Sequence, residues 1–94
     1  MITVKDVHAA DYLQCTIGDW QILKLLYDKG ILSNKEITSE TKHITIKSFY
    51  MRIHVLNLRL KRHNLGKIIN VRSHGYCLDQ KLTEVIASTL EKIQ

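Results

Sequence analysis

The sequence predicts one α+β domain, mainly helical, that spans residues 1–94. Three observations favour this class: apolar residues recur at helical spacing in several segments, two short alternating segments surround a turn near residue 74, and apolar residues make up 45% of the chain. A chain of 94 residues supports one modest hydrophobic core. We therefore expect three helices followed by a β-hairpin, with short strands at the N-terminus and an additional C-terminal helix.

The first 15 residues carry weak signals. Ile2 and Val4 alternate with polar residues, and Tyr12 and Leu13 follow, a pattern that predicts one or two short strands. Charged residues occur within the first six positions and no apolar signal core follows them, so export is not expected. Because no run approaches the roughly 18 apolar residues that a membrane span requires, we expect a cytoplasmic protein with no membrane partner.

Two capping boxes predict the starts of the next two elements. Thr16 lies three residues before Asp19, and Ser33 lies three residues before Glu36, so each hydroxyl can accept from a backbone N–H of its own first turn. Apolar residues at helical spacing follow the first box and stop at Gly30; they are Trp20, Leu23, Leu26 and Tyr27. We expect Trp20 to anchor the core and the second helix to end near Thr41.

A third helix is predicted from about residue 45 to about residue 64, because Gly66 follows it. Its apolar residues form two stripes on opposite sides, namely Phe49, Ile53, Leu56 and Leu60, and Met51, Val55 and Leu58. Both stripes require cover, and a polar strip of Tyr50, His54, Asn57 and Lys61 lies between them. One interpretation is a helix inserted between its own domain and a groove. The other is an ordinary core helix with a solvated face.

Residues 68–78 have the pattern of a β-hairpin. β-branched and aromatic residues alternate on both sides of a Ser73-His74-Gly75 turn, which puts Arg72 at the tip. Gly75 is expected to supply a positive φ. Apolar residues at helical spacing then predict a closing amphipathic helix over residues 80–94. This helix either covers the domain's own core or forms a dimer contact.

The charges are segregated along the chain. The net charge is +5, and every charged side chain from Lys42 to Arg72 is basic. Such a segment is typical of a nucleic-acid partner, although an acidic protein or a membrane surface also attracts it. In a basic domain of this size, three helices followed by a hairpin predict a winged helix-turn-helix, with helix 45–64 in the major groove and the wing at 68–78 on the backbone or minor groove. The candidate DNA-binding residues are Lys47, Tyr50, His54, Asn57, Arg59, Lys61, Arg72, His74 and Tyr76.

Several motifs also resemble one family, the OmpR/PhoB-type effector domains of response regulators. Ile53-His54-Val55, Leu58-Arg59 and Lys61 resemble its recognition-helix pattern "VHI..LR.K". Ile68, Val71-Arg72, Gly75-Tyr76 and Leu78 resemble its wing pattern "I.TVRG.GY.L", which is the most specific match. Weaker likenesses to the first two helices begin at Thr16 and Leu32, so the resemblance covers about residues 13–79 and leaves 80–94 as an addition.

The resemblance implies a DNA-binding transcription regulator that usually acts as a dimer. It implies phosphate contacts for His54, Arg59 and Tyr76, base reading by Asn57, and a minor-groove position for Arg72. The segment between the second and third helices is several residues shorter than in the family, which argues against the contact with RNA polymerase that this segment makes there. No receiver domain is present in the sequence, so phosphorylation control is not expected.

No pattern in the sequence points to catalysis. The histidines and cysteines lack the spacings that build a metal site locally, Cys15 and Cys77 form no CxxC, and no acidic group lies near Ser73-His74 to orient a nucleophile system. A glycine-rich phosphate loop is also missing, so we expect no enzyme, no cofactor and no metal.

The function that these patterns predict is sequence-specific binding of double-stranded DNA by a small stand-alone regulator, acting as a repressor or accessory factor. A homodimer is left open. The alternative is a winged-helix protein-interaction module that dimerises with a partner regulator and inhibits it without binding DNA. The exchange of commonly basic family positions for Leu56 and Asn57 favours this alternative. The net charge favours DNA, and so do Arg59, Arg72 and Tyr76.

Overall fold

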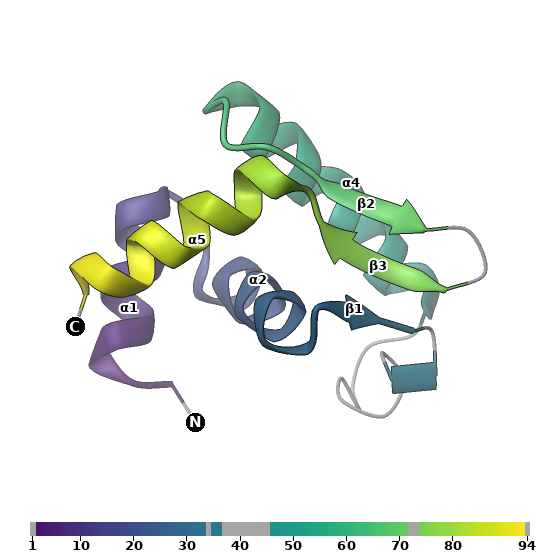
Figure 1. The fold of residues 1–94 in the computed structure, drawn as a ribbon, viewed down its shortest axis with the longest axis horizontal. Helices are drawn as coiled ribbons and strands as arrows, with labels where there is room; N and C mark the ends of the chain where they lie inside the picture. Colours follow the sequence, from purple (N-terminus) through teal and green to yellow (C-terminus); the bar gives the residue numbers. More distant parts are fainter. Residues whose placement is uncertain (1, 34, 37–45, 72–73, 94) are drawn as a thin grey trace.

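The computed structural model describes residues 2–33, 35–36, 46–71 and 74–93. The fold is mostly helical, and the helices surround a small sheet (Figure 1). The elements are α1 (Val4–Leu13), α2 (Ile17–Lys29), β1 (Ile31–Leu32), α4 (Ile46–Arg62), β2 (Ile68–Val71), β3 (Gly75–Leu78) and α5 (Gln80–Lys92). Residues 35 and 36 are also helical. The predicted α+β class with a majority of helix is confirmed. The predicted end of the second helix lies outside the described residues.

The sheet is antiparallel with the strand order β1-β3-β2, so β3 is central. Ile69 is opposite Cys77 in the hairpin, and Ile31 is opposite Cys77 from the other side. The hairpin and the positive φ of Gly75, which is +119°, are as predicted. A Cβ atom at Gly75 would lie 2.1 Å from the backbone oxygen of Leu32, so the close approach of β1 also requires glycine at this position.

The N-terminal segment is a helix, α1, and the prediction of short strands there was wrong. Thr3 and Asp6 form a full capping box: the Asp6 backbone N–H donates to Thr3 Oγ1, and the Thr3 backbone N–H donates to the Asp6 carboxylate. The buried residues of α1 are Ala9, Ala10 and Leu13, which are spaced for one helical face. Two alternating aliphatic residues were too short a pattern to outweigh this cap.

The predicted first helix is α2, and both of its ends form as expected. The Thr16 hydroxyl accepts from the Asp19 backbone N–H at 3.0 Å, and the helix stops at Gly30, whose φ is +81°. Trp20 is 1% exposed and is a core anchor, as predicted. The predicted helix at 33 also begins with its capping box, in which Ser33 Oγ accepts from the Glu36 backbone N–H.

One hydrophobic core joins the inner faces of all the described helices to the inner face of the sheet. It includes Leu23 and Leu26 from α2, Phe49 and Leu56 from α4, and Leu82 and Ile86 from α5. In Figure 1, α5 lies above α2 while α4 lies behind the β2–β3 hairpin, and both chain ends lie away from the sheet. The closing helix therefore covers the domain's own core on one side, and α4 covers it on another.

Candidate nucleic-acid interface

The outward face of α4 carries three large apolar side chains. Turning about 100° per residue, this helix points Phe49, Ile53, Leu56 and Leu60 into the core, all of them buried. Met51 and Leu58 lie opposite them and Val55 lies beside these two, with exposures of 64%, 55% and 52%. We call Met51, Val55 and Leu58 the outer stripe. The expectation that both apolar stripes require cover is met for the first stripe only, because none of the residues that the structure describes covers the outer stripe.

Basic side chains flank the outer stripe. His54 and Lys61 lie on one side of it, Arg62 lies one turn beyond Leu58 at its C-terminal end, and all three are exposed. The helix contains no Asp or Glu. The exposed face of α4 is therefore an apolar stripe with basic side chains along one side and at its C-terminal end.

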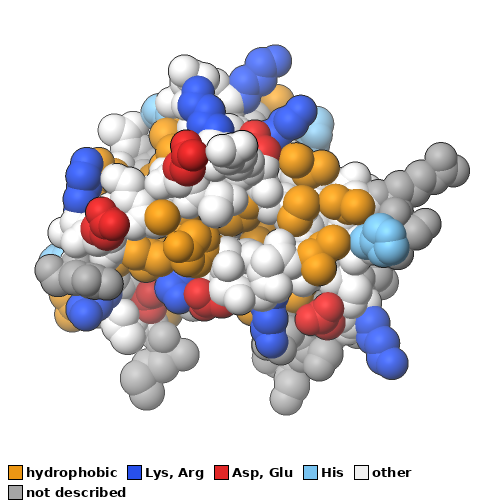
Figure 2. Space-filling model, in the orientation of Figure 1, with side chains coloured by type: hydrophobic (Ala, Val, Ile, Leu, Met, Phe, Trp, Pro, Cys, Tyr) orange, Lys and Arg blue, Asp and Glu red, His pale blue; other side chains and the backbone are white. Residues whose placement is uncertain are grey.

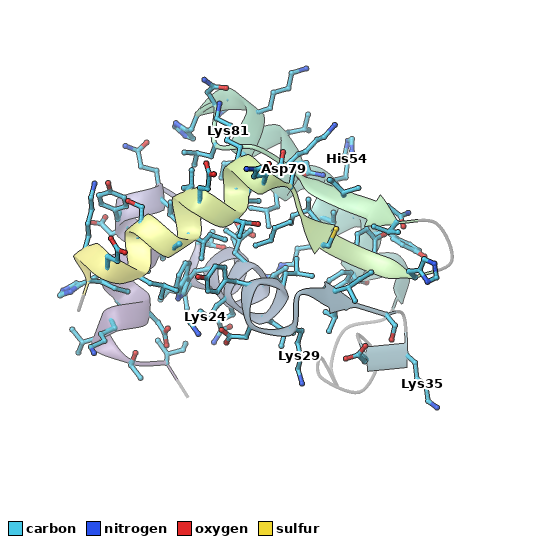
Figure 3. The ribbon with its side chains drawn as sticks, in the orientation of Figure 1. Lys24, Lys29, Lys35, His54, Asp79 and Lys81 are labelled. Carbon is cyan, nitrogen blue, oxygen red and sulfur yellow. The ribbon has the colours of Figure 1, made fainter. Side chains whose placement is uncertain are left out.

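A cleft of about 460 Å³ extends one basic border of α4 onto neighbouring elements. Among the residues that line it, His54 and Lys61 come from α4, Lys67 precedes β2, and Lys81 comes from the first turn of α5. Both oxygens of Asp79, the one acidic residue of the cleft, accept backbone N–H groups, from Lys67 at 3.1 Å and from Leu82 at 2.8 Å. Figure 3 shows His54, Asp79 and Lys81 along the same edge of the molecule. The cleft is suited to an anion such as a phosphate group.

Asn57 does not lie in the outer stripe, and the expectation that it reads bases is corrected here. Its Oδ1 accepts from the Ile68 backbone N–H at 2.8 Å, and its Nδ2 donates to the Ile68 backbone oxygen at 3.1 Å. The amide thus pairs with the open edge of β2 in the way that a neighbouring strand would. Each of its two polar atoms makes a hydrogen bond to β2, so the amide is directed at the hairpin and not at the outer stripe.

Arg59 forms an ion pair within the domain, which corrects its implied role as a phosphate contact. Its guanidinium bonds to the carboxylate of Asp19 in α2, and Asp19 is 6% exposed. The nearly buried carboxylate requires a cation to offset its lost hydration. Nearby, burial raises the pKa of the Cys15 thiol to about 11, and the negative charge of Asp19 adds to this rise.

Tyr76 is a core residue with 4% exposure, so its implied phosphate contact is also corrected. Its ring centroid lies 5.6 Å from that of Phe49 and 5.8 Å from that of Tyr50. Burial raises the pKa of Tyr76 to about 12, and the neighbouring Tyr50 contributes to the rise. Tyr50 itself is 42% exposed and borders the outer face of α4.

The remaining predicted site residues are placed only in part. His74 is exposed at the start of β3, and its backbone N–H donates to the Val71 oxygen at 2.9 Å. Lys47 lies in α4, but its side chain is outside the described residues, and so is Arg72. Of the nine predicted residues, the structure brings Tyr50, His54 and Lys61 together on the outer side of α4.

The face that Figure 2 shows differs in its charges from the exposed face of α4. Acidic and basic side chains alternate there, and hydrophobic side chains gather over the sheet. The sheet contributes Ile31 and Ile69, which are opposite the half-buried Cys77 on either side and partly exposed. The acid-free surface of α4 lies behind the hairpin in this view. The outer face of α4 is therefore better suited to a polyanion than the face in Figure 2.

Sequence reasoning missed the contribution of Lys67 and Lys81 to the cleft and of Arg62 to the outer face of α4. Lys67 and Lys81 come from separate elements, so no local spacing relates them to α4. Arg62 lies one turn beyond Leu58, and helical periodicity alone could have assigned it to the outer face.

Within the parts of the chain that the structure describes, no three His, Cys, Asp or Glu residues are placed to hold a metal ion. Among those same residues, no helix has the length and apolar character needed to span a membrane.

No protein-family model, curated protein or solved structure matches this chain.

Proposed function

We propose that this protein is a winged helix-turn-helix DNA-binding regulator of transcription, of the type found in OmpR/PhoB-type effector domains. The order of α2, β1, the helical residues 35 and 36, α4 and the β2–β3 hairpin supports this proposal. In such a domain α4 enters the major groove and the hairpin reaches the adjacent backbone or minor groove.

The observation that carries the proposal is the exposed face of α4. A helix in the major groove directs its central residues at base edges and its borders at the two phosphate backbones. The outer stripe has the position of the central residues, while His54 and Lys61 have the position of one border and Arg62 lies at the C-terminal end of the stripe. The cleft next to His54 and Lys61 adds Lys67 and Lys81 on one backbone.

The proposed regulatory role is repression or assistance to another regulator. Repression requires only occupancy of a site on DNA, whereas activation through RNA polymerase requires a further contact surface. In the resembling family that surface is the segment between the second and third helices, which is shorter in this sequence.

A salt titration of duplex binding tests the proposal. If about four to six phosphates are neutralised per protein, the logarithm of the affinity falls with the logarithm of salt at a slope of about 0.9 per phosphate. The measurement is fluorescence anisotropy with a labelled pool of genomic duplexes. Absence of any duplex binding at about 50 mM salt, where phosphate contacts are strong, contradicts the proposal.

Two variants of equal charge locate the contact surface. Lys61→Ala removes a cation from the border of α4, so its salt slope should fall by about 0.9. Lys24→Ala removes a cation from α2, where Lys24 bonds to Asp28 at 2.7 Å on another edge of the molecule (Figure 3). This control should keep the slope of the parent protein. Equal slopes for the two variants would show that DNA does not follow α4.

A second function is favoured by one observation, the large exposure of Met51, Val55 and Leu58. An apolar stripe with basic borders also suits a hydrophobic groove with an acidic rim on a partner regulator. In that case the protein blocks its partner and binds no duplex. A flat salt response in the titration favours this second function.

A further inference from the structure

We infer that the outer stripe recognises the C5-methyl groups of thymine, so that Met51, Val55 and Leu58 are the residues that determine sequence specificity. This inference rests on the proposed DNA binding and deepens it. Three large apolar side chains lie along the outward centre of α4 between Met51 and Leu58. These are a thioether side chain and two branched aliphatic side chains, none of which donates a conventional hydrogen bond.

Two polar side chains of α4 that could read bases are engaged within the domain. Asn57, which could bridge the N6 and N7 atoms of adenine, has both amide atoms bonded to Ile68. Arg59, which could bond to guanine, is paired with Asp19 and lies between the outer stripe and the core. The large exposed side chains of the outer stripe are apolar, so the contact that they can make with a base edge is apolar.

In the major groove, the thymine methyl is the apolar group that a base edge presents. Met51 and Leu58 lie seven residues apart, which is about 10 Å along the helix axis. This length corresponds to about three base-pair steps of duplex DNA. The outer stripe is thus matched to two or three thymine methyl groups within one short window of the site.

Replacement of thymine by uracil tests the inference directly, because uracil keeps every hydrogen-bonding group of thymine and lacks only the methyl. The duplex used is the tightest binder selected from a random pool, prepared once with thymine and once with uracil. Each lost methyl contact should weaken binding by a factor of about four, so two or three contacts give a loss of roughly 15- to 60-fold.

Two protein variants separate methyl recognition from altered DNA shape. The double variant Met51→Ala/Leu58→Ala should bind the thymine duplex more weakly and should lose most of the preference for thymine over uracil. The control His54→Ala removes a border residue, so it should weaken binding to both duplexes and keep the preference of the parent. All three side chains are exposed, so each substitution should shift the melting temperature by no more than about 4 °C.

The outcomes distinguish this inference from the proposed function. Duplex binding with equal affinity for thymine and uracil overturns methyl recognition and leaves DNA binding intact. A thymine preference that persists in Met51→Ala/Leu58→Ala also overturns it, because the preference would then come from DNA shape. Failure of the parent to bind any duplex overturns both proposals together and favours a protein partner for the outer stripe.

Discussion

Arg59 and Asp19 illustrate how one pair of residues ties two helices together. The pair joins α4 to α2, and its carboxylate is almost fully buried while the guanidinium is about one third exposed. A buried carboxylate without its cation is strongly unfavourable. The role of Arg59 is therefore to hold α4 in position, and its effect on the proposed DNA binding would be indirect.

Replacement of Arg59 tests this role. We expect Arg59→Ala to lower the free energy of unfolding by roughly 2 to 3 kcal/mol, because Asp19 remains buried without a partner. The control Arg62→Ala removes an exposed arginine from the same helix and should cost no more than about 0.5 kcal/mol. Urea denaturation followed by circular dichroism gives both values. Unchanged stability of Arg59→Ala with a large loss of DNA affinity would restore Arg59 as a phosphate contact.

At the scale of elements, the side chain of Asn57 connects α4 to β2. The strand order leaves the outer side of β2 without a neighbouring strand, and Asn57 satisfies the backbone groups of Ile68 on that side. The hairpin and the helix are thereby held as one unit. This connection determines the position of the hairpin relative to the outer stripe.

The variant Asn57→Ala tests whether this side chain holds the hairpin to α4. Loss of both hydrogen bonds to a partly buried backbone should cost about 1 to 2 kcal/mol of unfolding free energy and should speed amide hydrogen exchange at Ile68. Asn70→Ala, an exposed asparagine of β2 itself, is the matched control and should stay within about 0.5 kcal/mol of the parent. A change in base preference without loss of stability would return Asn57 to the role of a base reader.

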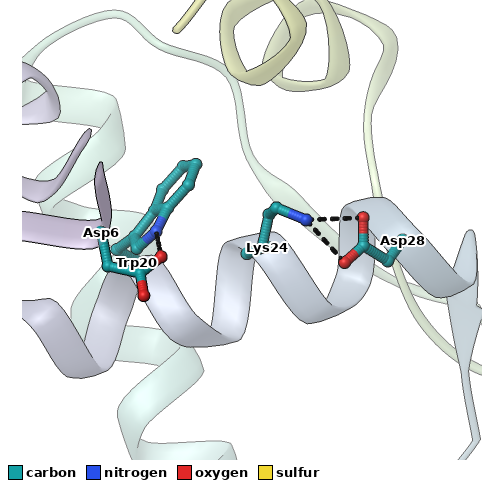
Figure 4. A network of polar contacts seen from close by, with 4 residues as sticks. All are labelled: Asp6, Trp20, Lys24 and Asp28. Carbon is teal, nitrogen blue, oxygen red and sulfur yellow. Dashed lines mark hydrogen bonds and ion pairs between the residues drawn. The ribbon is translucent and has the colours of Figure 1, made fainter. Parts of the chain in front are cut away.

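At the scale of the whole molecule, α1 is joined to α2 through Asp6. The Trp20 indole N–H donates to Asp6 Oδ1 at 3.0 Å, as Figure 4 shows beside the Lys24–Asp28 pair of α2. The backbone N–H of Thr3 and the Trp20 indole hold the pKa of Asp6 below its ordinary value of 3.8. A depressed pKa in the folded state stabilises the protein above the pKa of the unfolded chain, and this contribution is lost as the pH falls through the folded value.

The lowered pKa of Asp6 should make the stability of the folded protein sensitive to acid. We expect the parent to lose more unfolding free energy than Asp6→Asn between about pH 5 and pH 2. Asp11→Asn, an exposed substitution on the same helix, should follow the parent over this range. Because Trp20 is the single tryptophan of the chain, its fluorescence reports unfolding in all three proteins. Parallel curves for the parent and Asp6→Asn would show that Asp6 makes no pH-dependent contribution.

The sequence by itself determined most of the elements, because their signals are local. Thr16 and Gly30 bound α2, the capping box at Ser33 begins the next helix, and the alternation around residue 74 predicts the hairpin. At the N-terminus the Thr3–Asp6 box was available, but small alanine residues concealed the buried face of α1. The three-residue spacing of Thr3 and Asp6 was the better signal for that segment.

Only the tertiary structure decided which polar side chains of α4 are free. Arg59 finds Asp19 across 40 positions of the sequence, and Asn57 finds Ile68 across 11. The helical period orders residues around α4, but it says nothing of partners that other elements bring to it. The outer stripe remained exposed because those elements pack against the opposite side of α4, where burial of Phe49, Leu56 and their neighbours removes more apolar surface from water.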